Sequence, residues 1–395
     1  MSQTKVVIAG TNRLAVGKFG GAFLNSKEVD MASTVMRAAI ERSGIEPGQI
    51  DEVIFAQNYR SGKTPPNSAR VYAWNAGVPI EVPSFTVNKH CASSLRSVMS
   101  AAQAIKAGDA EVVLAGGIEL MSDSAYFLPG KLRWGGKIGH QQMQDPMVMF
   151  DPIVAMTTIQ TSNKMASVCN ISRAEQDEFA LLSQQRAEAA IKSGKFDGEI
   201  TPIEVKSKKG NVMFQIDECP RFGSTMEKLA SLKAVLEGGT VTAGNASVNA
   251  DGASATMVLS AARAEELGIK PLAEIVGYAS AGVDPSLMGI GPVPATKKLL
   301  DKVGLKPSDI DLVEINEAFA AVVVNFAHEL GISYDRINPN GGALALGHPI
   351  SATGTVLLSK LVYELKRRGG KYGLVTLCIG GGQGASLLIK NSDVD

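Results

Sequence analysis

The sequence has no excess charge of either sign, few cysteines and few aromatic residues, and each shortage excludes a class of protein. Lysine and arginine together number 39, as do aspartate and glutamate, so the formal net charge is zero. This balance argues against nucleic acid or an anionic membrane surface as the main partner. The four cysteines are widely separated and form no CxxC pair. Neither a structural metal site nor a disulfide framework is expected, and the reducing cytoplasm is the expected compartment.

Long apolar runs are also missing. Nowhere do about 18 consecutive apolar residues occur, as a membrane-spanning helix requires, and no secretory apolar region precedes the first strand-like run at 6–9. We therefore expect no membrane association. Hydrophobic residues still make up 45% of the chain, which is too many for a disordered protein. A high glycine count of 41 with only 5% aromatic residues favours a close-packed α/β enzyme over a β-sandwich.

Strand-like runs alternate with helical patterns, which predicts parallel sheets covered by helices. The segment 92–106 is one such helix, because its apolar residues recur at spacings of three and four. The motif Gly44-Ile-Glu-Pro47 returns 260 residues later as Gly304-Leu-Lys-Pro307, and Ile-Asp follows each copy at the same distance. Two copies indicate a duplicated α/β half, because a solenoid needs at least three. Residues 119–250 have no counterpart in the second half and are predicted to be an insert.

Four polar clusters stand out as candidate chemistry. Cys91 directly precedes the predicted 92–106 helix, where the positive end of the helix dipole should lower the pKa of its thiol. A lone cysteine is nevertheless more often buried and inert. The other clusters follow strands or occupy glycine-rich turns, where α/β folds place their ligands. The four clusters are VNKHCASSL (87–95), NEAFA (316–320), NPNGGALALGHPISATG (338–354) and CIGGGQG (378–384).

These clusters resemble the thiolase family, the CoA-dependent acyltransferases that make or cleave 3-oxoacyl-CoA. Further matches run over nearly the whole chain: VGKFGG (16–21), ISRAEQDEFA (171–180), TVTAGNAS (240–247) and YASAGVDP (278–285). The resemblance implies two βαβαβαββ halves in a five-layer α-β-α-β-α core with an inserted loop domain. The first half would comprise residues 1–118 and 251–271, and the second half residues 272–395. The loop domain, residues 119–250, would carry CoA and oligomer contacts.

The resemblance also implies a division of catalytic roles. Cys91 matches the acylated nucleophile, His348 the histidine that takes its proton, and Cys378 the acid/base that removes an α-proton from acetyl-CoA. A water held by Asn316 would stabilise the enolate together with His348. The backbone N–H groups of Cys91 and Gly380 would stabilise the tetrahedral intermediate.

For coenzyme A, the resemblance implies contacts at four positions. Ser247 matches a serine that contacts pantetheine, and Arg221 an arginine near the nucleotide. Met288 and Phe319 match residues that line the pantetheine tunnel. Coenzyme A would act as a substrate, with no prosthetic group. The family also implies a homodimer or tetramer, in some members with an unlike accessory subunit.

The sequence departs from the family pattern near the nucleophile. His90 replaces a small or apolar residue, Ala92-Ser93-Ser94 replaces Gly-Ser-Gly, and Ser351 and Thr353 alter GHPIGASG. Thr157-Thr158 stands where short-chain members carry a His-Met pair that shapes the acetoacetyl pocket. We therefore expect a bulkier branched, dicarboxylic or aromatic 3-oxoacyl-CoA in a degradative pathway. The alternative is that the departures are neutral and the chain is an ordinary acetoacetyl-CoA thiolase.

Two rival classes remain open. A 3-oxoacyl synthase shares the fold and the cysteine nucleophile, but it uses two histidines or His/Asn, so Cys378 speaks against it. A catalytically silent scaffold subunit is disfavoured because the catalytic residue types are all present.

Overall fold

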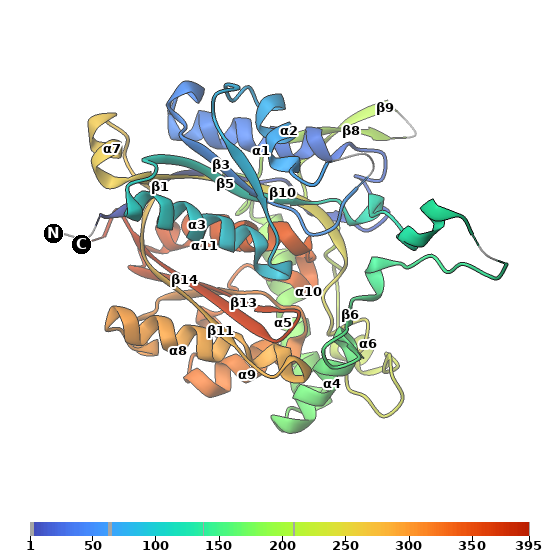
Figure 1. The fold of residues 1–395 in the computed structure, drawn as a ribbon. Helices are drawn as coiled ribbons and strands as arrows, with labels where there is room; N and C mark the ends of the chain where they lie inside the picture. Colours follow the sequence, from blue (N-terminus) through green and yellow to red (C-terminus); the bar gives the residue numbers. More distant parts are fainter. Residues whose placement is uncertain (1–3, 62–64, 137, 208–209, 395) are drawn as a thin grey trace.

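The computed structural model describes residues 4–61, 65–136, 138–207 and 210–394. Its centre is a ten-stranded sheet with the order β12-β13-β14-β11-β1-β10-β5-β3-β4, in which β2 also pairs with β10. Figure 1 shows this sheet divided into two stacked parts, with β1, β10, β5 and β3 above and β11, β14 and β13 below. The first part contains β1 (Val6–Arg13), β2 (Gly17–Lys18), β3 (Glu52–Ala56), β4 (Ser84–Val87), β5 (Val112–Glu119) and β10 (Ala250–Ser260). The second contains β11 (Ala273–Gly282), β12 (Leu312–Ile315), β13 (Tyr372–Ile379) and β14 (Gln383–Asn391).

Helices cover both outer faces and fill the space between the two parts of the sheet (Figure 1). The outer helices of the first half are α1 (Glu28–Ser43) and α2 (Ser68–Asn75), and those of the second half are α8 (Pro292–Val303) and α9 (Ala320–Leu330). Between the sheets lie α3 (Ser93–Ala107) and α11 (Thr353–Arg368). Three separate apolar clusters fill the interfaces between these layers. The predicted five-layer α-β-α-β-α core is confirmed.

The central helix α3 follows directly from its sequence pattern. Its predicted apolar stripe is buried between the two parts of the sheet, in one cluster with residues of α11, β5 and β13. Each buried Leu- or Ile-sized side chain stabilises the fold by about 1.5–3 kcal/mol. The stripe consists of Leu95, Val98, Met99, Ala102 and Ile105.

The two copies of the repeat adopt the same local structure. Gly44 and Gly304 end α1 and α8 in the left-handed conformation, both with φ of +71°, which explains the glycine in each motif. A short 3₁₀ turn follows each glycine, Pro47–Gln49 in one copy and Pro307–Asp309 in the other. The next strands are β3 and β12, so the sequence repeat marks a structural duplication.

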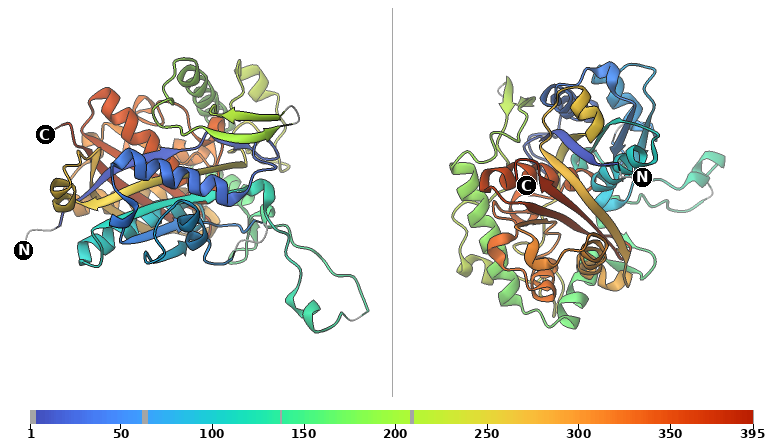
Figure 2. Two further views of the ribbon diagram at one scale, coloured as in Figure 1. Left: turned by 90° about the horizontal axis from the view of Figure 1, so that it is seen from above. Right: turned by 90° about the vertical axis from the view of Figure 1, so that its left-hand side faces the viewer.

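The long excursion between β5 and β10 contains the elements without a counterpart in the second half. One stretch before β6, coloured teal, projects away from the body as an extended arm (Figures 1 and 2). No helix in the described parts of the chain is long and apolar enough to cross a bilayer. The elements of the excursion are β6 (Phe150–Asp151), β7 (Met156–Thr157), α4 (Thr158–Val168), α5 (Arg173–Lys192), β8 (Ile203–Ser207), β9 (Gly210–Phe214) and α6 (Met226–Ala230). The remaining helices are α7 (Ala261–Glu266) and α10 (Ala343–Leu346).

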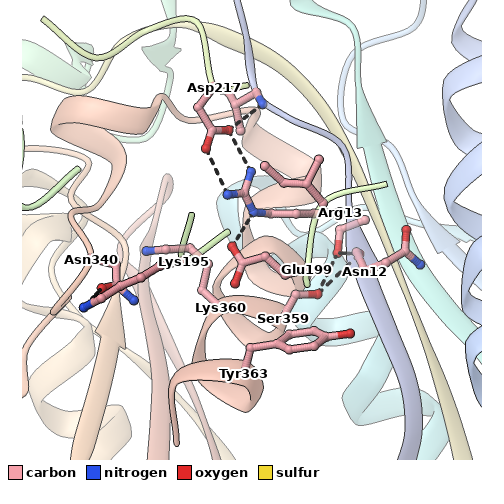
Figure 3. A network of polar contacts seen from close by, with 12 residues as sticks. Asn12, Arg13, Lys195, Glu199, Asp217, Asn340, Ser359, Lys360 and Tyr363 are labelled. Atoms are coloured by element: carbon pink, nitrogen blue, oxygen red, sulfur yellow. Dashed lines mark hydrogen bonds and ion pairs between the residues drawn. The ribbon is translucent and has the colours of Figure 1, made fainter. Parts of the chain in front are cut away.

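Buried charges fasten this excursion to the core (Figure 3). Arg13, at the end of β1, donates from Nε to Glu199 Oε1 at 2.8 Å. Its Nη1 and Nη2 donate to the two Asp217 oxygens at 2.7 and 2.9 Å, the bidentate geometry that suits a guanidinium. Asp217 also accepts a hydrogen bond from the backbone N–H of Val16. Sequence patterns did not indicate this network.

Candidate active site

Cys91 lies in a tight turn between β4 and α3. The turn is the 3₁₀ helix η2 (His90–Ala92), and His90 has a φ of +47°, which non-glycine residues rarely adopt. Cys91 is half-buried, and the backbone N–H groups of Cys91 itself and of Gly380 act on its sulfur and favour the thiolate. The two amides predicted to bind an oxyanion therefore already converge at the nucleophile.

The pKa expected for Cys91 from its position at a helix start is wrong. Burial raises the pKa of this thiol to about 11, against the opposing effect of the two N–H groups. The loss of hydration therefore outweighs the helix dipole, whose effect on a charge is modest. At neutral pH Cys91 is a thiol, and its nucleophilic form requires a base.

His348 is a buried imidazole whose tautomer follows from its neighbours. Thr353 Oγ1 donates to Pro349 O at 3.0 Å, so it accepts from His348 Nδ1–H at 2.6 Å. This leaves the lone pair on Nε2, which lies 3.3 Å from Asn316 Nδ2. Burial lowers the pKa of His348 to about 4, so the ring is neutral at physiological pH. His348 is therefore able to accept a proton at Nε2.

Asn316 follows the last residue of β12 and is fully buried. Its backbone N–H donates to Thr376 O at 3.0 Å and holds it beside β13. Its side-chain Oδ1 has no hydrogen-bond partner among the described residues. Because an unpaired buried amide oxygen is unfavourable, this atom is available to a donor from substrate or water. The water-binding role predicted for Asn316 is consistent with that geometry.

Cys378 and Gly380 lie where β13 ends and turns into β14. Burial raises the pKa of Cys378, and a negative charge on Cys91 raises it further, because the two thiols are close enough to interact. The turn continues through Gly382, which has a φ of +75°. A Cβ at Gly382 would lie 2.5 Å from Val283 O, so only glycine fits there.

A cavity of about 860 Å³ opens at the two thiols, and the described residues that line it do not include His348 or Asn316. Cys91, Cys378, Gly380 and Met288 all line it, and among these four only Cys378 and Gly380 are neighbours in the sequence. Much of the opposite wall comes from the excursion, at residues 143–153. This volume and its two thiols make the cavity the candidate acyl-binding site.

The other residues predicted to contact CoA are Ser247, Phe319 and Arg221, and they differ in whether they adjoin the catalytic segments. Ser247 donates from its backbone N–H to Ala318 O at 3.0 Å, and the following residue, Val248, accepts from the backbone N–H of His348. Phe319 is buried at the start of α9 and forms a β-bridge with Ala246. Ser247 and Phe319 therefore adjoin the catalytic segments. The Arg221 guanidinium is exposed and contacts Ala243 O at 3.4 Å, away from the cavity lining.

Three of the residues that differ from the family pattern, His90, Thr157 and Thr158, lie at or near the cavity but have different roles. Thr158 and His90 line the cavity, as expected for a changed wall. The expectation that Thr157 also shapes the wall is wrong, because its side chain caps α4 and accepts from Gln160 N at 3.4 Å. Capping satisfies a helix N–H that would otherwise be unpaired.

Sequence reasoning missed several residues of the site. Tyr59 lines the cavity, and Glu119 is a buried carboxylate that contacts both Tyr59 and the turn after His348. Thr353 was noted only as a departure, yet it binds the imidazole directly. A glutamate closing the apolar strand VVLAGGIE was a signal for Glu119, because charged residues are rarely fully buried without a partner.

Family models, relatives and solved structures match this chain over nearly its whole length. A family model described as "Thiolase, N-terminal domain" matches residues 6–262, and one described as "Thiolase, C-terminal domain" matches residues 269–391. The acetyl-CoA acetyltransferase of Cupriavidus necator is 47% identical over 392 residues, which cover 98% of this chain and 99% of the relative. The crystal structure of the Bacillus anthracis acetyl-CoA acetyltransferase aligns with a TM-score of 0.95 at 43% identity, covering 98% and 99%. Human mitochondrial 3-ketoacyl-CoA thiolase in complex with CoA aligns with a TM-score of 0.95 at 39% identity, covering 98% of each chain.

Proposed function

The chain belongs to the thiolase family and is an acyltransferase, and we propose that its substrate is acetoacetyl-CoA. The proposal makes it an acetyl-CoA C-acetyltransferase, which is the alternative that the sequence left open. The names of the Cupriavidus necator and Bacillus anthracis relatives support this choice. They give no support to the expected bulkier substrate.

The observation that carries the proposed chemistry is the meeting of two thiols and two backbone N–H groups at one cavity. In the cleavage direction, His348 Nε2 takes the proton of Cys91, and the thiolate attacks the 3-oxo carbon of acetoacetyl-CoA. The negative oxygen that forms would be stabilised by the N–H groups of Cys91 and Gly380. One such donor typically contributes about 2.7–4 kcal/mol to the transition state.

The second thiol completes the reaction. When the bond between C2 and C3 breaks, the acetyl-CoA enolate takes a proton from Cys378 and leaves as acetyl-CoA. Cys378 then removes the proton of incoming CoA, whose thiolate attacks acetyl-Cys91 and releases a second acetyl-CoA. Cys91 leaves as a thiolate and takes back its proton from His348, which restores the starting enzyme. His348 and a water on Asn316 would stabilise the enolate oxygen. The unpaired Oδ1 of Asn316 supports that water site.

Coenzyme A would approach along Ser247, Met288 and Phe319, with Arg221 near its nucleotide. The human thiolase that binds CoA supports coenzyme A as the substrate. A homodimer or tetramer is supported by exposed apolar side chains on the projecting arm, including Trp134 at 85% exposure. No observation favours an unlike accessory subunit.

A bulkier acyl group remains a second candidate because Thr158 and His90 line the cavity wall. The deciding experiment measures kcat/KM for acetoacetyl-CoA and for branched, aromatic and dicarboxylic 3-oxoacyl-CoA at one CoA concentration. We expect acetoacetyl-CoA to be the best substrate. A higher value for any bulkier thioester would favour the second candidate, and no CoA-dependent cleavage of any of them would refute both.

A further inference from the structure

Glu119 is a buried carboxylate that no step of the proposed reaction uses, although it contacts two segments of the active site. It ends β5 and is fully buried. Its Oε1 accepts from the backbone N–H of Tyr59, and its Oε2 accepts from that of Ser351, both at 2.9 Å. The two segments that it joins are otherwise far apart in the sequence.

Each segment has a part in the site. Tyr59 lines the cavity beside Cys91. Ser351 belongs to the 3₁₀ turn η9 (Ile350–Ala352), which lies between His348 and Thr353. Because Thr353 Oγ1 holds His348 Nδ1, a displacement of this turn would displace the imidazole.

A second glutamate holds the cavity wall without contacting the His348 turn. Glu28 accepts hydrogen bonds from the side chains of Gln57, Ser61 and Tyr72. The segment 57–61 is therefore anchored by two buried carboxylates, and within the described parts of the chain Glu119 is the one of the two that also reaches η9. Glu28 therefore provides a matched control for Glu119, because both glutamates hold the segment 57–61.

We propose that Glu119 is a positioning residue, which holds the Ser351 turn, and with it the His348 imidazole, at a fixed place relative to the cavity wall at Tyr59. The inference rests on the proposed function, because it assumes that His348 takes the proton of Cys91. Only an acceptor with two oxygens satisfies both N–H groups, and a buried N–H left unpaired is costly. Burial raises the pKa of Glu119 to about 8, against the opposing effect of the two N–H groups. Above that pH its negative charge adds a small rise to the pKa of Cys91, which burial of the thiol mainly sets.

The test measures acetylation of Cys91 in single turnovers with acetyl-CoA, by peptide mass spectrometry, for wild type and Glu119→Gln. The pH is kept above the Glu119 pKa of about 8, so that the wild-type side chain is a carboxylate. The glutamine amide would face one of the two N–H donors, so that the turn would shift. We expect acetylation to slow by about 10- to 100-fold, because small misplacements of catalytic groups have effects of this size, while KM for CoA stays unchanged. The pH midpoint for alkylation of Cys91 by iodoacetamide should fall, because a negative charge is removed.

Two further variants separate position from general loosening. Glu28→Gln should destabilise the same wall but change the acetylation rate far less. Glu119→Asp keeps the charge with a shorter reach, so it should slow acetylation without lowering the alkylation midpoint. Wild-type acetylation in Glu119→Gln, or equal slowing in Glu28→Gln, would overturn the inference. Absence of acetyl-Cys91 in the wild type would instead refute the proposed function.

Discussion

Cys91 and Cys378 are chemically identical groups on one cavity, yet the two halves of the chain give them different surroundings. Cys91 is half-buried in a turn before a helix, and two backbone N–H groups favour the charged form of its sulfur. Cys378 is buried at the end of a strand, and its pKa is raised by burial and by the charge of its neighbour. Stabilising the negative sulfur favours a nucleophile, whereas a less stable thiolate is the stronger base. The surroundings, rather than the residue type, predict which thiol carries the acyl group.

Of the variants that test the different roles of the two thiols, Cys91→Ala should lose the most activity. Without the nucleophile no acyl-enzyme forms, so kcat should fall by about 10⁴-fold or more. Acyl transfer is measured by the mass of the 91-containing peptide after incubation with acetyl-CoA. Cys169→Ala serves as the control, because Cys169 caps the end of helix α4 and is not among the cavity-lining residues, so activity should be unchanged. An acyl label found on Cys378 alone would reverse the assigned roles.

Cys378→Ala should produce the second-largest effect and a different pattern of loss. Acetylation of Cys91 should persist, because that step uses His348 as the base. Overall turnover should fall by about 10²- to 10⁴-fold, the usual contribution of a general acid or base. The diagnostic measurement is exchange of the acetyl-CoA methyl protons with deuterated water by NMR. Exchange at the wild-type rate would show that another group is the base.

A smaller effect is expected from Thr353→Val, which removes the hydroxyl that fixes the His348 tautomer. Loss of this buried hydrogen bond should cost about 1–3 kcal/mol, equivalent to about 5- to 150-fold in the acetylation rate. The steps assigned to Cys378 should change less than acetylation. Thr353→Ser keeps the hydroxyl and should restore most of the rate. Equal activity in the valine and serine variants would argue that the tautomer is set elsewhere.

The smallest expected effect is a shift in the pH at which each of the two thiols is alkylated. As pH rises toward 11, iodoacetamide should alkylate Cys91 first, because its pKa of about 11 lies below that of Cys378. In Cys91→Ala, alkylation of Cys378 should move to lower pH, since removing a neighbouring negative charge lowers the pKa of the remaining thiol. Peptide mass spectrometry across a pH series measures both. A shift of Cys378 to higher pH would contradict the coupling.

The layers of the fold were predictable because their signals are local. The apolar stripe of α3 repeats every three or four residues, and Gly44 and Gly304 mark helix ends that only glycine adopts readily. The candidate catalytic side chains of Cys91, His348 and Cys378 were predictable for a similar reason, since each lies within a short family motif.

The supporting contacts were not predictable, because they join distant residues of ordinary type. Glu119 lies 60 residues from Tyr59 and 232 from Ser351, and no periodic pattern links them. The pKa of Cys91 was misjudged because it depends mainly on how deeply the folded chain buries the thiol, which a helix start does not reveal. Thr157 was misjudged because capping and wall-lining are equally compatible with a threonine before a helix.

The Arg13 network of Figure 3 has a consequence for how the chain is made. The partners of Arg13, Glu199 and Asp217, are synthesised 186 and 204 residues after it. At about 5–20 residues per second, that interval is roughly 10–40 s. During this time β1 also lacks β10 and β11, its partners in the sheet. β1 must therefore stay hydrated or be shielded by a chaperone until these later partners have emerged.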